Sequence, residues 1–178
     1  ADWFWKYKYF LQNLQKKGKK CHAKFIYANH LFKNRKYRDA LKIYSDINSD
    51  KLNKEEQDEC DFKTAYCHYQ TQNIYIATPI FENLSKTTNK YKDDATYYYA
   101  HISYINEESD KALELFKSLK QNEKYADIAD IYILQINFEK GNHDEVVDKG
   151  DNILTKAQKN RKADIALMLA ESWHQQGD

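Results

Sequence analysis

Three stretches of the sequence share one spacing of small, aromatic and aliphatic residues. In each stretch two alanines lie twelve positions apart, an aromatic residue follows four positions later, and an aliphatic residue follows after three more. The sets are Ala28, Ala40, Tyr44 and Ile47; Ala65, Ala77, Phe81 and Leu84; and Ala100, Ala112, Phe116 and Leu119. They recur at steps of 37 and 35 residues, a period typical of stacked structural repeats. This recurrence restricts the chain to a series of similar units.

Within a unit the apolar residues follow the spacing of α-helices. Phe25, Ala28, Leu31 and Phe32 form one i, i+3, i+4, i+7 stripe, and residues 37–47 form a second one after the turn at 34–36. Four glycines and one proline are too few for the turns of an all-β fold. One helix pair cannot cover its own apolar face, so successive pairs stack. We therefore predict an all-α fold, more than about 70% helical, built as a right-handed solenoid of antiparallel helix pairs.

The units resemble the tetratricopeptide repeat (TPR), which places small residues at its eighth and twentieth positions and an aromatic residue at its twenty-fourth. The resemblance covers residues 21–178 and is closest to large multi-repeat proteins of gram-negative bacteria, to which segments 94–100 and 111–116 are similar. The chain departs from the TPR pattern because its repeats lack the usual Trp and the closing Pro. The resemblance implies a first helix, called A, and a second, called B, in each repeat.

The same register divides the whole chain. It predicts one solenoid domain over 1–178, with a partial repeat at 1–20 (helix B), full repeats at 21–54, 58–91, 93–126 and 127–160, and helix A of a truncated repeat at 163–178. The fourth repeat is degenerate, because Leu134, Val146 and Gly150 stand where the others have two small residues and a ring. Gly141 and Gly177 share one position, where glycine ends a helix. We expect the chain to be cut from a longer array.

Two segments carry more specific expectations. Pro79 would cost about 3 kcal/mol inside a helix, so Thr78 and Pro79 are predicted to be an N-cap and first helical residue, with 73–77 irregular or kinked. Residues 3–11 mix aromatic rings and lysines. We expect them to form a terminal helix packed on the first full repeat; a membrane-interface anchor is the alternative.

Motifs for catalysis and cofactor binding do not occur in the sequence. It has no glycine-rich phosphate loop, no HExxH, no GxSxG and no pair of Cys or His at zinc spacing. Cys60, Cys67 and His68 come nearest to a metal cluster, but their spacing does not match that of structural zinc sites. Cys60 and Cys67 lie seven positions apart on one helix face, which is too great a distance for a disulfide to span. We predict no enzyme activity, no cofactor and no metal site.

The faces of the A helices remain as the candidate binding surface. In TPR proteins positions five, nine and twelve of helix A line a concave groove. The register and the neighbouring Lys63 give this set of groove residues: Phe25, Asn29, Phe32, Phe62, Lys63, Tyr66, Tyr69, Tyr97, His101, Tyr104 and Phe138. Some of these rings must also pack between neighbouring A helices. The clamp that holds a C-terminal carboxylate in some TPR proteins is not reproduced, because only Asn29 and Lys63 fall in fitting places.

These features predict a scaffold that binds a protein or peptide segment in an aromatic groove. RNA binding by helical-hairpin repeats is the alternative, and it is disfavoured by the net charge of +1 from 28 basic and 27 acidic residues. The sequence contains no apolar run long enough to span a membrane. The resemblance to bacterial proteins favours the cell envelope over the cytoplasm.

Overall fold

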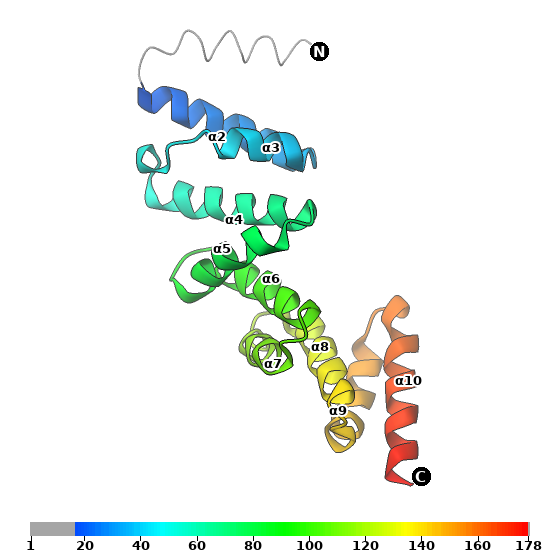
Figure 1. The fold of residues 1–178 in the computed structure, drawn as a ribbon. Coiled ribbons are helices and arrows are strands. Elements are labelled where there is room, and N and C mark those ends of the chain that lie inside the picture. The colour runs from blue at the N-terminus through cyan, green and yellow to red at the C-terminus, as the bar shows by residue number, and fades with distance from the viewer. Residues whose placement is uncertain (1–16, 178) are drawn as a thin grey trace. The chain divides into compact units, whose positions relative to one another are not determined.

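The structure is a computed structural model that describes residues 17–177, of which 79% are helical (Figure 1). This range contains nine α-helices, one 3₁₀ turn at Ser49–Lys51, and no strand. The helices are α2 (Lys17–Lys33), α3 (Tyr37–Tyr44), α4 (Lys54–Gln70), α5 (Ile74–Lys86), α6 (Lys92–Ile105), α7 (Ser109–Ser118), α8 (Ala126–Glu139), α9 (His143–Lys156) and α10 (Lys159–Gln176). The predicted all-α fold is confirmed.

The described residues fall into two compact units, one ending at Ala95 and the other beginning at Thr96. In the first, called unit 1, α2 packs on α3, α3 packs on α4, and α4 packs on α5. In the second, called unit 2, α7 packs on α8, α8 packs on α9, and α10 packs on both α9 and α8. Within each unit these helices pack on their neighbours in the sequence, as expected of stacked helix pairs. The limits predicted for individual repeats stay a prediction.

The repeated small residues lie at the helix contacts. All six alanines of the first three sets are fully buried: Ala28, Ala40, Ala65, Ala77, Ala100 and Ala112. The rings that follow them, Tyr44, Phe81 and Phe116, are at most 3% exposed. A short side chain lets two helices approach closely enough for a ring of the partner to fill the space between them. The spacing that defines the repeat is thus the spacing of the core.

Every helix that comes first in a pair ends with a residue in the left-handed backbone region. These residues are Arg35, Gln72, Glu107, Gly141 and Gly177, with φ between 57° and 91°. In the first four, the N–H of the next residue donates to a carbonyl five positions back, for example Lys36 to Leu31, which satisfies the helix end. The helix stops expected at Gly141 and Gly177 are confirmed, and three further repeats make the same turn without glycine.

The prediction of a late start for the helix around Pro79 is wrong. Helix α5 begins at Ile74 and contains Pro79. Proline removes one backbone donor, so the carbonyl of Tyr75 lacks its usual partner. The hydroxyl of Thr78 donates to the carbonyl of Ile74 at 2.8 Å, and the proline ring itself is exposed. Because the helix packs on α4 through Ala77, Phe81 and Leu84, burial of these residues outweighs the missing hydrogen bond. The terminal helix predicted at 3–11 lies outside the described residues.

Candidate functional site

Three aromatic rings meet on the exposed side of α2 and α4 in unit 1. Phe32 contacts Tyr66 edge to face, with ring centroids 5.3 Å apart, and Tyr37 of α3 contacts both of them at 5.8 and 5.6 Å. All three side chains are half-buried. Burial raises the pKa of Tyr37, and its electrostatic interaction and hydrogen bond with Tyr66 raise it further. The cluster is therefore fixed by ring contacts while part of each ring stays open to solvent.

The polar residues predicted for this groove are bonded to a single carboxylate. Asn29 donates to Glu59 at 3.1 Å and accepts a hydrogen bond of 2.6 Å from the hydroxyl of Tyr44. Lys63 and Lys90 form ion pairs with Glu59 at 2.5 and 3.5 Å. Burial alone would raise the pKa of Glu59, but the hydrogen bond and charge of Lys63 and the charge of Lys90 outweigh it and the pKa is lowered. Asn29 and Lys63 thus both bind the carboxylate of Glu59, Asn29 by a hydrogen bond and Lys63 by an ion pair.

Two of the predicted groove rings belong mainly to the core. Phe25 and Phe62 are 5% and 9% exposed. Phe62 stacks on Tyr91 with centroids 4.8 Å apart and meets Phe81 edge to face at 5.9 Å. These rings support the surface from below and present little area of their own. Tyr69, the last but one residue of α4, is half-buried.

Unit 2 repeats the arrangement with two stacked ring pairs. Tyr97 stacks on Tyr125 at 4.9 Å, and Phe116 stacks on Tyr132 at 4.6 Å. His101 and Tyr104 meet the face of Tyr132 edge-on at 5.5 and 5.4 Å. Tyr97, His101 and Tyr104 are half-buried, so unit 2 also has a row of rings that is partly exposed to solvent.

Burial sets the protonation of these groups. It raises the pKa of Tyr97 to about 12, and the electrostatic interaction and hydrogen bond with Tyr132 act in the same direction. Burial and then the positive charge of Arg161 lower the pKa of His101, so this imidazole is neutral at pH 7. The hydroxyl of Tyr104 donates to Glu139. Phe138, the last of the predicted residues, is half-buried and meets His143 edge to face at 5.8 Å.

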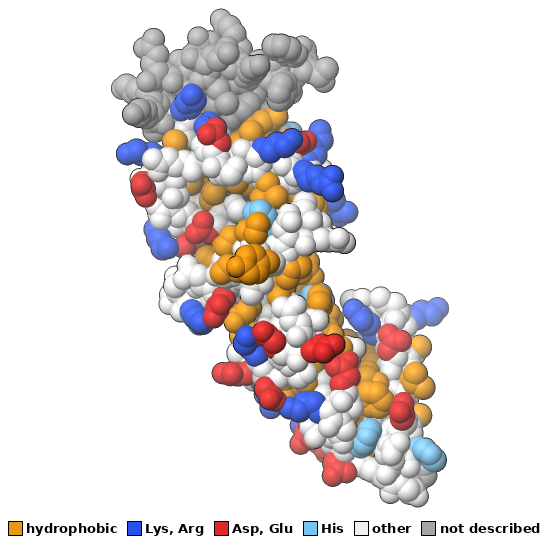
Figure 2. All heavy atoms as spheres, viewed as in Figure 1, with side chains coloured by type: hydrophobic (Ala, Val, Ile, Leu, Met, Phe, Trp, Pro, Cys, Tyr) orange, Lys and Arg blue, Asp and Glu red, His pale blue; other side chains and the backbone are white. Residues whose placement is uncertain are grey.

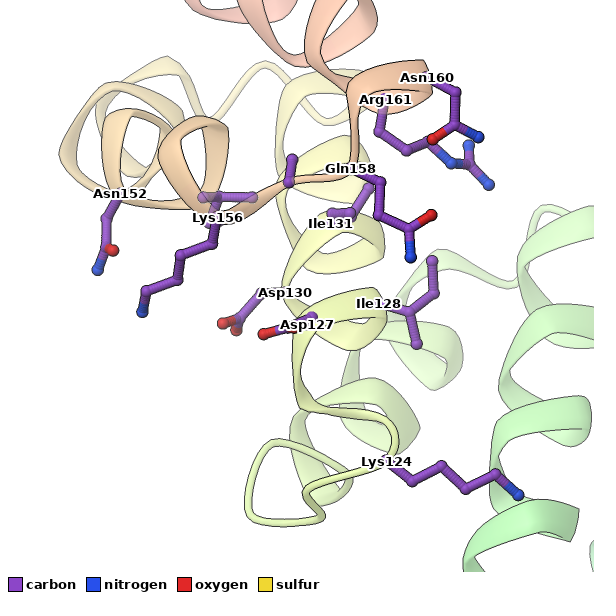
Figure 3. Close-up of a pocket in the computed structure, with 12 residues that line it drawn as sticks. Lys124, Asp127, Ile128, Asp130, Ile131, Asn152, Lys156, Gln158, Asn160 and Arg161 are labelled. Carbon is purple, nitrogen blue, oxygen red and sulfur yellow. The ribbon is translucent and has the colours of Figure 1, made fainter.

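Three residues that contribute to these surfaces are not among the predicted ones: Tyr37, Tyr132 and Arg161. Tyr37 begins a B helix, and Tyr132 lies one position away from the predicted stripe on α8. Arg161 lies in the first turn of α10 and lines a pocket of about 330 Å³ between the ends of α8, α9 and α10 (Figure 3). Its signal in the sequence was its rarity, because only three of the 28 basic residues are arginines.

Large apolar side chains also reach the surface outside the A-helix faces. Tyr75 and Ile76, at the start of α5, are 93% and 46% exposed, and Leu167 of α10 is 68% exposed. Figure 2 shows hydrophobic side chains open to solvent around α4 and α5. Single exposed apolar residues are common on protein surfaces. Tyr75 is useful as a comparison because it is a fully open ring on a B helix.

Metal and membrane sites find no support in the part of the chain that the structure describes. Residues 17–177 contain no group of three or more His, Cys, Asp or Glu side chains placed to hold a metal ion. No helix in this range combines the length and the apolar composition that crossing a membrane requires. Cys21, Cys60 and Cys67 are all free thiols.

Comparison with solved structures identifies the architecture. The chain matches the crystal structure of nearly identical TPR-like repeats from a Podosopora anserina protein that carries the name kinesin light chain. The TM-score is 0.61, and the match covers 92% of this chain and 90% of the other. The chain has a TPR-like repeat fold. Sequence identity is 11%, so the likeness concerns the fold alone. No protein-family model and no curated protein matches the sequence.

The TPR-like fold gives the aromatic rows a place in a known architecture. Residues Phe32, Tyr66 and Tyr69 lie on A helices of unit 1, and Tyr97, His101 and Tyr104 lie on the A helix α6. TPR-like repeats commonly mediate contacts between proteins. In each unit the row therefore lies on the first helix of a helix pair.

Proposed function

We propose that the protein is a non-catalytic scaffold that binds a peptide or protein segment on the aromatic faces of its A helices. In unit 1 the contact residues would be Asn29, Phe32, Lys63, Tyr66 and Tyr69, supported from below by Phe25 and Phe62. In unit 2 they would be Tyr97, His101, Tyr104 and Phe138. No catalytic group, cofactor, metal or nucleic acid enters this proposal.

The observation that carries the proposal is the state of the rings, which are half-buried and held in fixed geometry. Phe32, Tyr37 and Tyr66 contact one another edge to face at 5.3 to 5.8 Å. A ring that is already ordered loses little conformational freedom when a ligand covers it. Aromatic side chains with one open edge are also the residues that most often carry binding energy in protein interfaces.

The test uses peptides selected from a displayed library against the purified protein, with affinities measured by isothermal titration calorimetry. Tyr66→Ala removes a central ring of the unit 1 row, and Tyr104→Ala removes one of the unit 2 row. Loss of a central ring costs on the order of 2 kcal/mol, which corresponds to about thirtyfold weaker binding. Each selected peptide should lose this affinity with one of the two variants.

The matched control is Tyr75→Ala, which removes an equally large ring that is 93% exposed on a B helix. Circular dichroism melting of all three variants separates loss of binding from loss of folding. Binding that survives Tyr66→Ala and Tyr104→Ala but fails with Tyr75→Ala would move the site to the B helices. The A-helix rings would then serve packing between helices only.

A further inference from the structure

Arg161 carries a charge that the described part of the chain does not neutralise. It lies in the first turn of α10 and is half-buried. Within residues 17–177 its guanidinium forms neither an ion pair nor a hydrogen bond. A partly buried guanidinium gives up some of its hydration, and bonds to an anion restore what it has lost. The other two arginines, Arg35 and Arg38, belong to unit 1.

The cavity beside Arg161 has room for part of a peptide. Its volume is about 330 Å³, and Ile128, Ile131 and Ile153 contribute apolar lining. The side chains of Gln158 and Asn160 join Arg161 in the lining and offer amide donors and acceptors. Most of the lining residues are polar or charged, so the pocket suits a polar ligand group with a small apolar part beside it.

The charges around the pocket are divided between two sides. In Figure 3, Asp127, Asp130 and Lys156 lie on one side, and Gln158, Asn160 and Arg161 lie on the other. Asp130 is already paired with Lys120 at 3.2 Å. No carboxylate labelled in the figure lies on the Arg161 side.

The Arg161 side of the pocket is electrostatically connected to the aromatic row of unit 2. After burial, the charge of Arg161 is the second cause that lowers the pKa of His101. The same charge acts on the pKa of Tyr97, where it opposes the raising effects of burial and of Tyr132. A ligand bound to Arg161 would therefore lie close to the row formed by Tyr97, His101 and Tyr104.

We propose that this pocket binds a carboxylate of an acidic peptide segment, with Arg161 as its principal partner. The planar guanidinium donates two parallel hydrogen bonds to a carboxylate, which a lysine cannot reproduce. The side chain next to that carboxylate is apolar and contacts Ile128 and Ile131. The inference rests on the proposed peptide-binding function and adds the chemical class of the segment that unit 2 recognises.

Three fluorescein-labelled peptides of equal length test the proposal by fluorescence anisotropy. The first contains Leu and Glu and has an amidated C-terminus. The second has Gln for every Glu and a free C-terminal carboxylate, and the third has Gln and an amidated C-terminus. We expect the first or the second to bind at least about tenfold more tightly than the third, a difference of 1.4 kcal/mol. Comparing the first two tells a side-chain carboxylate from a terminal one.

Variants of Arg161 connect the binding to this pocket. Arg161→Gln should abolish the preference over the third peptide, Arg161→Lys should retain only part of it, and Arg38→Gln should leave it unchanged. Because the Arg161 guanidinium has no bond to the described chain, its loss should leave the melting temperature unchanged. Equal binding of all three peptides, or failure of the first two to bind at 1 mM, would overturn the proposal. The proposed function is tested separately, by the displayed peptides and the variants Tyr66→Ala and Tyr104→Ala. A failure of the Arg161 proposal would leave that test unaffected.

Modification by phenylglyoxal gives a second readout that needs no variant. The reagent attacks arginine, and the chain offers only Arg35, Arg38 and Arg161. Mass spectrometry then follows each site with and without the tightest peptide at saturation. We expect the peptide to slow modification of Arg161 at least fivefold and to leave Arg35 and Arg38 unaffected. Equal slowing at all three sites, or none at Arg161, would contradict the assignment.

Discussion

The side chain of Leu169 occupies the space beside the Cα of Gly150. A Cβ placed on Gly150 would lie 2.7 Å from Cγ of Leu169, closer than packed carbon atoms approach. Leu169 comes from α10 and is 1% exposed, so it has no open space to move into. In the three preceding repeats the position of Gly150 holds Tyr44, Phe81 or Phe116. The fourth repeat thus replaces its own ring with a side chain from the next helix.

Gly150→Ala should therefore destabilise the protein although alanine is the better helix former. The gain in helix propensity is about 1 kcal/mol, while overpacking of a buried site costs about 1 to 3 kcal/mol. We expect the free energy of unfolding, measured by urea denaturation, to fall by about 1 kcal/mol. In a Leu169→Ala background the obstruction is gone, so the same change should become neutral or stabilising. A parent-like or higher stability of the single variant would show that the site can relax.

The buried alanines give a second prediction about packing. Ala40 and Ala112 are fully buried at helix contacts. Ala40→Leu and Ala112→Leu each add three carbon atoms to a filled site and should cost about 1 to 3 kcal/mol. Ala163→Leu, an exposed site within α10, is the control and should change stability by less than about 0.5 kcal/mol. Equal melting temperatures of the two buried-site variants and the Ala163→Leu control would contradict the tight packing around Ala40 and Ala112.

The turn after each A helix can be tested through its left-handed residue. Gly141 has φ +73° and no atom within 4 Å of an added Cβ, so Gly141→Ala would cost only backbone strain, about 1 kcal/mol. Gln72 has φ 64°, so Gln72→Gly should raise the free energy of unfolding by a few tenths to about 1 kcal/mol. Gln70→Gly, at the last residue of α4, should lower it by a few tenths of a kcal/mol. Opposite signs at positions 70 and 72 in urea denaturation are the expected result.

The thiols should differ sharply in reactivity. Burial, followed by the charge of Asp61, raises the pKa of Cys60 to about 11, and burial raises that of Cys67 to about 12, whereas Cys21 is half-exposed. At pH 8 we expect one fast thiol per chain with Ellman's reagent, and three in denaturant; Cys21→Ser should remove the fast reaction. Because both pKa values are raised on folding, their stabilising contribution is complete below pH 9 and is lost as the pH rises towards 12. Fast reaction of all three thiols in the folded protein would contradict this.

The sequence predicted the helix pairs and the buried alanines because a repeat reports the same contact several times. It failed at Pro79, since the rule that proline breaks helices is local and the burial of Ala77, Phe81 and Leu84 depends on packing against α4. It placed a turn at 34–36 but did not predict the left-handed backbone of Arg35, Gln72 and Glu107, because a residue type that tolerates φ above zero only at a cost leaves no mark in the sequence. The repeat spacing therefore predicts which residues pack together, but not which residues adopt a strained backbone conformation.

The candidate site was less predictable than the fold. Helix position indicated which rings lie on the A-helix faces, but not that Phe25 and Phe62 are buried while Tyr66 stays half-open. That distinction depends on how far the neighbouring helix covers each ring. Likewise, nothing in the sequence couples Asn29 and Lys63 through Glu59, because the three residues come from two helices whose contact only the fold defines.

Glu59 offers a test of that charged network and of its pH dependence. Its pKa is lowered below 4.5 in the folded chain, so the stabilisation it provides is present above its ordinary pKa and is lost as the pH falls through the lowered value. Glu59→Gln removes the anion that Lys63 and Lys90 share, and it should lower the free energy of unfolding at pH 7 by about 1 kcal/mol, a modest figure because water screens the pair.

Urea denaturation at pH 7 and at pH 3 checks this expectation. At pH 3 the carboxyl of the parent protein becomes increasingly protonated, so the difference between parent and variant should shrink. Glu145→Gln is the matched control, because Glu145 forms an exposed pair with Lys149 one turn away in α9 and should leave stability unchanged at both pH values. A loss of equal size at pH 7 and pH 3 would mean that Glu59 stabilises unit 1 through packing and hydrogen bonding to Asn29 and not through its charge.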